Sequence, residues 1–172
     1  QVGTTTTNSY NYNITGGTVR IGSNNYDSTY TAYGYISNLR AVRNAVYTGN
    51  FTPPNAPLLT SGTSSIYSNT ANVNTTFSSA NTSLLTCASN RLIDTSSNSF
   101  ALTKNGDTTV NAFHPFVSPY GSYASTYFDG TGDYLSIPTN TNIVFPSTVT
   151  FTVEFWIYPT GYASGASYNE GR

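Results

Sequence analysis

Few residues in this sequence are of the types that carry out chemistry, and the acidic ones are mostly isolated. Glu154 lies in a strand-like segment whose neighbouring positions on the same face are Thr152 and Trp156. Hydrolysis of a glycosidic bond normally needs two carboxyl groups, one on each side of the scissile bond. Because Glu154 has no acidic partner on its face, we do not expect this reaction. We expect Glu154 to be a hydrogen-bonded residue at the solvent or intersheet rim.

Two other carboxylates could hold a metal ion. Asp129 and Asp133 bracket a Gly-Thr-Gly turn, and carboxylate oxygens spaced in this way could ligate Ca²⁺. Asp-Gly sequences also form tight turns without any ion, so a turn is the competing interpretation. Asp27 is a lesser candidate of the same kind. Ca²⁺ is the one cofactor for which the sequence offers ligands, because it has neither a Cys/His cluster for zinc nor a glycine-rich phosphate loop.

The remaining nucleophiles and bases are predicted to be structural. His114 is the only histidine and stands between Phe113 and Pro115, and no G-x-S-x-G nucleophile elbow is present. Cys87 is the only cysteine, so it cannot form an internal disulfide, and no His or Lys stands near it in sequence to activate the thiol. We therefore predict no catalytic residue and a buried, inert thiol.

Sugar binding is better supported than catalysis. Glycan sites combine aromatic faces for stacking with amide and hydroxyl groups for hydrogen bonds. Asn25, Tyr26, Tyr30 and Tyr33 offer this combination within one loop. Tyrosine is also frequent on β-sheet surfaces that bind nothing. These four residues are therefore a candidate glycan site whose alternative is an ordinary sheet surface.

The composition narrows the class of partner. Charged residues make up 8% of the chain, with six Lys and Arg against seven Asp and Glu. Nucleic-acid binding requires clustered basic side chains against phosphates, and a helix on a membrane surface requires a basic face. No apolar run approaches about 18 residues, the length that spans a bilayer. We therefore expect neither a nucleic acid nor a membrane as partner.

Asparagine and threonine are abundant, and they create four sequons of the form Asn-x-Ser/Thr. These would accept glycans in a eukaryotic secretory protein. They begin at Asn13, Asn50, Asn74 and Asn81. In a chain of this composition several sequons arise by chance, and a bacterial virus would leave them unmodified.

The alternation of apolar and polar side chains indicates β structure. Residues 149–158 alternate strictly, which predicts a strand with one apolar face. That face is formed by Val149, Phe151, Val153, Phe155 and Ile157. A slip in the alternation between Ile36 and Leu39 predicts a β-bulge in an earlier strand. The Gly-bearing turn at 129–133, with Phe128 before it and Leu135 after it, predicts a hairpin.

No stretch shows a helical period over a useful length. Roughly ten short strands with frequent turns therefore predict an all-β antiparallel sandwich. Residues 1–12 form a polar run in which Tyr10 and Tyr12 are two apart, and a hairpin arm and a loop are both consistent with it. Three prolines within residues 53–57 close the first ordered part, and residues 59–82 have the composition of a linker.

Two separated segments resemble one family. Residues 17–58 include YISNLRAVRNAVYTGNFTPP, and residues 83–159 include FDGTGDYLSIP and FTVEFWIYP. They resemble the carboxyl-terminal and amino-terminal parts, respectively, of laminin-G-like domains of the concanavalin A-like lectin/glucanase superfamily. Such domains occur in tandem in phage and other virion-fibre or cell-surface proteins. The resemblance implies a jelly-roll sandwich.

The order of the two segments implies a window across a tandem array. In this interpretation residues 1–58 end one domain, residues 59–82 are a linker, and residues 83–172 begin the next domain. A single circularly permuted sandwich is the alternative, in which residues 1–58 supply the strands that residues 83–172 lack. In both cases neighbouring chain would have to complete a half-sandwich that otherwise exposes its edges and core.

The resemblance implies a non-enzymatic structural and adhesive segment of a virion fibre, tail or decoration protein. Its expected partners are neighbouring repeats, copies of itself, other fibre subunits and surface glycans. An architectural module of a secreted or cell-surface adhesin, or of an extracellular fibre, is the second hypothesis. A glycoside hydrolase of the glucanase branch is a remote third, because those enzymes carry paired acids two residues apart on one strand face, where this chain has only Glu154.

Overall fold

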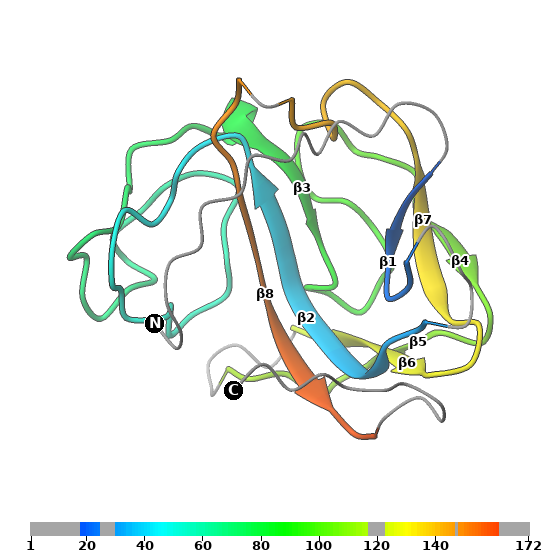
Figure 1. The fold of residues 1–172 in the computed structure, drawn as a ribbon. Coiled ribbons are helices and arrows are strands. Elements are labelled where there is room, and N and C mark those ends of the chain that lie inside the picture. The colour runs from blue at the N-terminus through cyan, green and yellow to red at the C-terminus, as the bar shows by residue number, and fades with distance from the viewer. Residues whose placement is uncertain (1–17, 25–29, 117–122, 147, 162–172) are drawn as a thin grey trace, which may run out of the picture.

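The computed structural model describes residues 18–24, 30–116, 123–146 and 148–161. Within these residues the chain is all-β, with eight strands in two antiparallel sheets (Figure 1). The helical structure described is one 3₁₀ turn, Ser79–Asn81 (η1), and none of it is long or apolar enough to cross a membrane. The prediction of an all-β antiparallel sandwich is confirmed. The jelly-roll order of connections stays a prediction.

The two sheets differ in width. The strands are β1 (Thr18–Ile21), β2 (Tyr33–Val42), β3 (Thr82–Thr86), β4 (Thr103–Asn105), β5 (Thr109–Asn111), β6 (Ser125–Asp129), β7 (Tyr134–Pro138) and β8 (Thr152–Pro159). The smaller sheet has the order β1-β7-β4, and the larger has the order β3-β2-β6-β5 with β8 also paired to β2. β2 is the centre of the larger sheet, because β8 lines one of its edges while β6 and β3 share the other.

The predicted bulge lies in β2. The pairing of β2 with β8 changes register between Ser37 and Arg40, and Asn38 has a φ of 52°. Asparagine tolerates this left-handed conformation better than most residues. The buried Asn38 side chain accepts a hydrogen bond from the backbone N–H of Leu58 at 3.0 Å. The bulge therefore ties the middle of β2 to the chain that follows the proline-rich segment.

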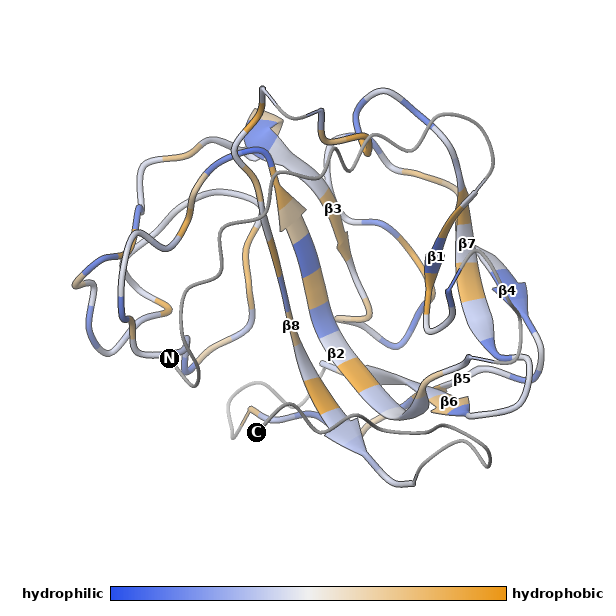
Figure 2. Ribbon diagram, in the orientation of Figure 1, coloured by the Kyte–Doolittle hydropathy of each residue, from blue (hydrophilic) through white to orange (hydrophobic). Residues whose placement is uncertain are grey.

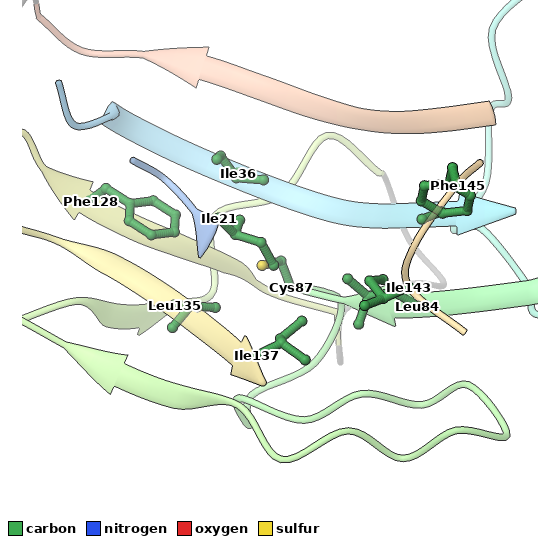
Figure 3. Close-up of a cluster of buried hydrophobic side chains, with 10 residues drawn as sticks. Ile21, Ile36, Leu84, Cys87, Phe128, Leu135, Ile137, Ile143 and Phe145 are labelled. Carbon is green, nitrogen blue, oxygen red and sulfur yellow. The ribbon is translucent and has the colours of Figure 1, made fainter. Parts of the chain in front are cut away.

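The main core lies between the two sheets (Figure 3). Phe128 of β6 and both Leu135 and Ile137 of β7 are completely buried. Ile21 of β1 and Ile36 of β2 pack into the same cluster. Figure 2 shows the alternation of apolar and polar residues along β2 and β7 that directs one face of each strand inward.

The prediction of a hairpin around residues 129–133 is wrong. β6 and β7 flank this turn, but they belong to different sheets, so the turn is an arch that crosses the sandwich. The turn at 105–107 connects β4 to β5 across the sheets in the same way. Alternation identifies which face of a strand is buried but not which strand pairs with it. The glycines have their expected role, since φ is 85° at Gly130 and 72° at Gly132.

The early and late parts of the chain share both sheets. β1 pairs with β7, and β2 pairs with β3, β6 and β8. Between them, Ile66 and Tyr67 of the 59–82 segment are buried against Leu85 of β3. The early and late segments thus form one pair of sheets. The division into parts of two tandem domains and the single permuted sandwich both stay predictions.

Replacement of Phe128 tests the main core. We expect Phe128→Ala to lower the free energy of unfolding by about 3–5 kcal/mol, because it leaves a cavity where the ring is completely buried. Leu59→Ala is the control, because that side chain is 40% exposed and its loss should change stability by less than about 0.5 kcal/mol. Chemical denaturation measures both values, and equal effects would contradict this account of the core.

Candidate functional site

The outer face of the larger sheet carries a group of aromatic rings. Ile36 and Phe128 point into the core, so Tyr35 and Tyr127, one residue before each of them, point outward. Their ring centroids are 4.8 Å apart. Tyr158 of β8 lies opposite Tyr35 in the pairing of β2 with β8, and the two ring centroids are 6.3 Å apart.

A fourth ring comes from the chain after β5. The Phe113 ring centroid lies 4.8 Å from that of Tyr35 and 5.0 Å from that of Tyr158. Together Tyr35, Phe113, Tyr127 and Tyr158 form what we call the aromatic cluster. Phe113 is 44% exposed and Tyr158 is 56% exposed, so two of its rings offer their surface to solvent.

A hollow of about 190 Å³, which we call the aromatic hollow, opens beside the aromatic cluster. It is lined by Tyr35, Ser37, Phe113, His114, Pro115, Ser125, Trp156, Ile157 and Tyr158. Most of these side chains are apolar or aromatic, and none is Asp, Glu, Lys or Arg. A concave, mainly apolar surface with a few polar groups is the usual form of a small-molecule site.

The polar groups of this hollow are two hydroxyls and an imidazole. Ser125 is buried, and its Oγ has no hydrogen-bond partner among the described residues. Ser37 Oγ donates to the backbone oxygen of Ala124 at 3.0 Å. His114 Nδ1 accepts the backbone N–H of Phe116 at 3.2 Å, so the neutral ring carries its proton on Nε2. The hollow therefore combines aromatic surface with hydroxyl and N–H groups.

A second hollow lies along β8 beyond Trp156. Its volume is about 410 Å³, and Trp156 lines both hollows. Tyr47 and Phe51 form one wall, with ring centroids 3.7 Å apart and an interplanar angle of 17°. Pro53 and Pro54 extend this wall. The outward side chains of β8 thus run from the second hollow to the first.

Glu154 lies beside the second hollow and is held in a polar network. The completely buried Arg40 donates to Glu154 Oε1 from Nε at 2.8 Å and from Nη2 at 2.6 Å. Its Nη1 donates to the backbone oxygen of Leu59 at 2.6 Å, and the Tyr47 hydroxyl donates to Glu154 Oε2. Burial, together with the charge of Glu154, raises the pKa of the Tyr47 phenol well above its usual value. Glu154 is therefore engaged through both oxygens.

Removal of Glu154 tests this network. We expect Glu154→Ala to reduce the free energy of unfolding by about 3–5 kcal/mol, because the buried guanidinium of Arg40 would lose its counter-charge. The double variant Arg40→Met/Glu154→Ala should lose less than the sum of the two single variants, since it removes both charges. Urea denaturation of the four proteins gives the coupling, and strictly additive losses would contradict the network.

Asp133 clamps the two arches together. Its Oδ1 accepts the backbone N–H groups of Asp107 and Thr108 at 2.8 and 3.0 Å, and its Oδ2 accepts that of Asp129 at 2.9 Å. Carboxylate oxygens of Asp107, Asp129 and Asp133 also lie within 4.8 Å of one another. The structure thus brings together the predicted pair and adds Asp107, which is far away in sequence. The buried Asp133 carboxylate already accepts three backbone hydrogen bonds, which explain its position without an ion. Calcium binding here stays a prediction.

Asp133→Asn separates a turn clamp from a metal site. An amide offers one acceptor oxygen instead of two, so we expect stability to fall by about 1–3 kcal/mol. The exposed side chain of Asp107 provides the control, and Asp107→Asn should change stability by less than about 0.5 kcal/mol. Both measurements are made in EDTA and in CaCl₂. A rise of the wild-type melting temperature in CaCl₂ that Asp133→Asn abolishes would identify a calcium site instead.

The loop predicted to bind glycans is only partly described. Asn25 and Tyr26 lie outside the described residues, while Tyr30 is 57% exposed and Tyr33 is 38% exposed. Tyr33 packs closely over Gly130, and neither Tyr30 nor Tyr33 lines the aromatic hollow. The loop therefore stays a prediction that is separate from this hollow.

Sequence reasoning missed the aromatic hollow for an identifiable reason. The outward positions of Trp156 and Tyr158 were visible in the alternation of β8. Their neighbours Tyr35 and Phe113 come from distant parts of the chain, and only strand pairing brings them together. No local signal in the sequence indicates that meeting.

The remaining predicted residues have ordinary surroundings. The thiol of Cys87 is buried, and burial raises its pKa to about 11. Among the sequons, Asn50 is exposed, whereas the side chains of Asn74 and Asn81 are half-buried and hydrogen-bonded within the chain. Asn13 lies outside the described residues.

Comparisons of the chain with protein families, with curated proteins and with solved structures give no match. Function is therefore inferred from the chain's own geometry, and above all from the hollow beside the aromatic cluster.

Proposed function

We propose that this chain is a non-enzymatic β-sandwich segment that binds glycans in the hollow beside the aromatic cluster. The observation that carries the proposal is the pair of exposed rings, Phe113 and Tyr158, at the mouth of a hollow that also contains Trp156. The apolar face of a sugar ring stacks on aromatic side chains. Sugar hydroxyls then hydrogen-bond to nearby polar groups such as His114 Nε2.

The lining of the hollow favours a neutral glycan. No Asp, Glu, Lys or Arg is among the described residues that line it. A sulfated or sialylated sugar would normally be matched by a cationic side chain at its anionic group. Hydroxyl-rich, uncharged sugars require only the stacking surface and the few polar groups that are present.

The proposal that the segment does not hydrolyse glycans is supported by Glu154. Its two carboxylate oxygens are occupied by Arg40 and Tyr47, and it has no acidic partner two residues away on the strand. A glycosidase needs one carboxyl group free to donate a proton and a second to act as base or nucleophile. A glucanase function is therefore the remote alternative.

The biological setting is proposed from the resemblance to laminin-G-like domains. We place the segment in a virion fibre, tail or decoration protein, where neighbouring repeats or subunits would adjoin it. A secreted or cell-surface adhesin is the alternative setting. The polar, nearly uncharged composition, with a net charge of −1, suits both.

A printed array of neutral and acidic glycans tests the proposal, followed by titration of any bound glycan. Tyr158→Ala and Phe113→Ala should each weaken binding about tenfold, which corresponds to about 1.4 kcal/mol, because each removes a stacking ring. Tyr30→Ala is the matched control, since this exposed tyrosine lies outside the hollow and its loss should leave binding unchanged.

Weaker binding in Tyr30→Ala, with unchanged binding in Tyr158→Ala and Phe113→Ala, would place the site in the predicted loop instead. An absence of binding to every printed glycan would favour a purely architectural role. Release of reducing ends from a laminarin-type polymer by the wild-type chain would overturn the non-enzymatic assignment.

A further inference from the structure

The aromatic hollow and the second hollow adjoin each other along β8. Trp156 and Ile157 line both of them. Tyr158 lines the aromatic hollow and Glu154 lines the second hollow, two residues to either side of Trp156. Positions two apart on a strand are separated by about 7 Å and project from the same face. A ligand that extends from the aromatic hollow past Trp156 therefore enters the second hollow.

Packing holds Trp156 in place between the two hollows. Its ring meets the buried ring of Phe116 nearly edge-on, with centroids 5.0 Å apart and an interplanar angle of 74°. Trp156 also packs against the buried cluster that includes Leu58 and Leu85, and it remains half-buried. The indole therefore offers a preorganised aromatic surface, which lowers the entropy that a ligand loses on binding.

The polar network of Glu154 holds the opposite wall of the second hollow. The Tyr47 hydroxyl donates to Glu154 Oε2, while Arg40 donates to Oε1. The Phe51 ring stacks on Tyr47 with centroids 3.7 Å apart. The network thus fixes an aromatic pair at the second hollow, which is a stacking surface of the kind that sugar rings use.

Charge and hydrogen bonding favour an uncharged, hydroxyl-rich ligand in the second hollow. Among the described residues that line it, Glu154 is the one ionised side chain, and the buried guanidinium of Arg40 balances its charge. An ionised carboxylate has about four acceptor positions, so Oε2 can accept a sugar hydroxyl as well as the Tyr47 hydroxyl. A charged ligand would find no unbalanced partner here.

We propose that the two hollows together bind one linear, uncharged glycan, which lies along β8 and crosses Trp156. This extended site rests on the glycan binding proposed above for the aromatic hollow, and it specifies the class of ligand. A short oligosaccharide is accommodated within the aromatic hollow, whereas a longer one also contacts Tyr47 and Phe51. The segment therefore recognises a stretch within a neutral polysaccharide chain and not its terminal sugar alone.

Titration with oligosaccharides of increasing length tests the extended site. The probes are linear, uncharged oligomers of glucose, galactose and mannose, each from the disaccharide to the hexasaccharide. Trp156 is the only tryptophan of the chain, so its fluorescence reports binding to the unaltered protein. We expect the affinity for the recognised sugar to rise at least tenfold between the disaccharide and the hexasaccharide, because the longer chain also occupies the second hollow.

Phe51→Ala separates the contributions of the two hollows. It removes a ring that lines the second hollow but not the aromatic hollow. The affinity for the hexasaccharide should fall about tenfold, while the affinity for the disaccharide should stay at the wild-type value. Phe113→Ala should weaken the binding of both. Tyr30→Ala is the matched control, since its exposed ring lies outside both hollows, and it should change neither affinity.

The possible failures of the two proposals differ. Equal affinities of the unaltered protein for the disaccharide and the hexasaccharide would overturn the extended site and leave glycan binding by the aromatic hollow in place. Failure of every oligomer to bind would overturn both proposals. Dimerisation in sedimentation velocity that Phe51→Ala abolishes would assign the second hollow to a second copy of the chain, and would overturn the extended site as well.

Discussion

The buried guanidinium of Arg40 constrains this structure more than any other single group. A charge removed from water must be paired, and its carboxylate partner is Glu154, from β8 at the other end of the chain. Arg40 also binds the backbone oxygen of Leu59. One side chain therefore joins the central strand β2, the segment after the prolines and the last strand. The pairing of β2 with β8 is consistent with this requirement.

That pairing has opposite consequences on the two faces of the larger sheet. On the outer face it places Tyr158 beside Tyr35 and Trp156 beside Ser37, which creates the wall of the aromatic hollow. On the inner face it extends the row of Ile36 and Ala41 onto Ile157 and Val153 of β8, which are 57% and 48% exposed. A candidate binding surface and a row of exposed apolar side chains thus arise from the same strand.

The arches at the opposite end of the sandwich depend on a second buried carboxylate. Asp133 accepts three backbone hydrogen bonds from two turns that are distant in sequence. Because hydrogen bonds to a charged acceptor are stronger than neutral ones, a single side chain can hold both crossings in place. A metal ion would be bound by the same two oxygens that accept these hydrogen bonds. The three observed donors favour the role of a turn clamp.

Local patterns in the sequence were sufficient to predict the all-β class, the bulge in β2, the glycine turns at 130 and 132, and the shared face of Trp156 and Tyr158. Each of these follows from local periodicity or from the conformational freedom of individual residues. Strand pairing and packing were needed to show that Asp129–Asp133 is an arch, that Phe113 joins Tyr35 and Tyr158, and that the apolar side chains of β8 are exposed. The physical reason is that alternation specifies the face of a strand, whereas its partners depend on long-range hydrogen bonds and on the packing of distant segments.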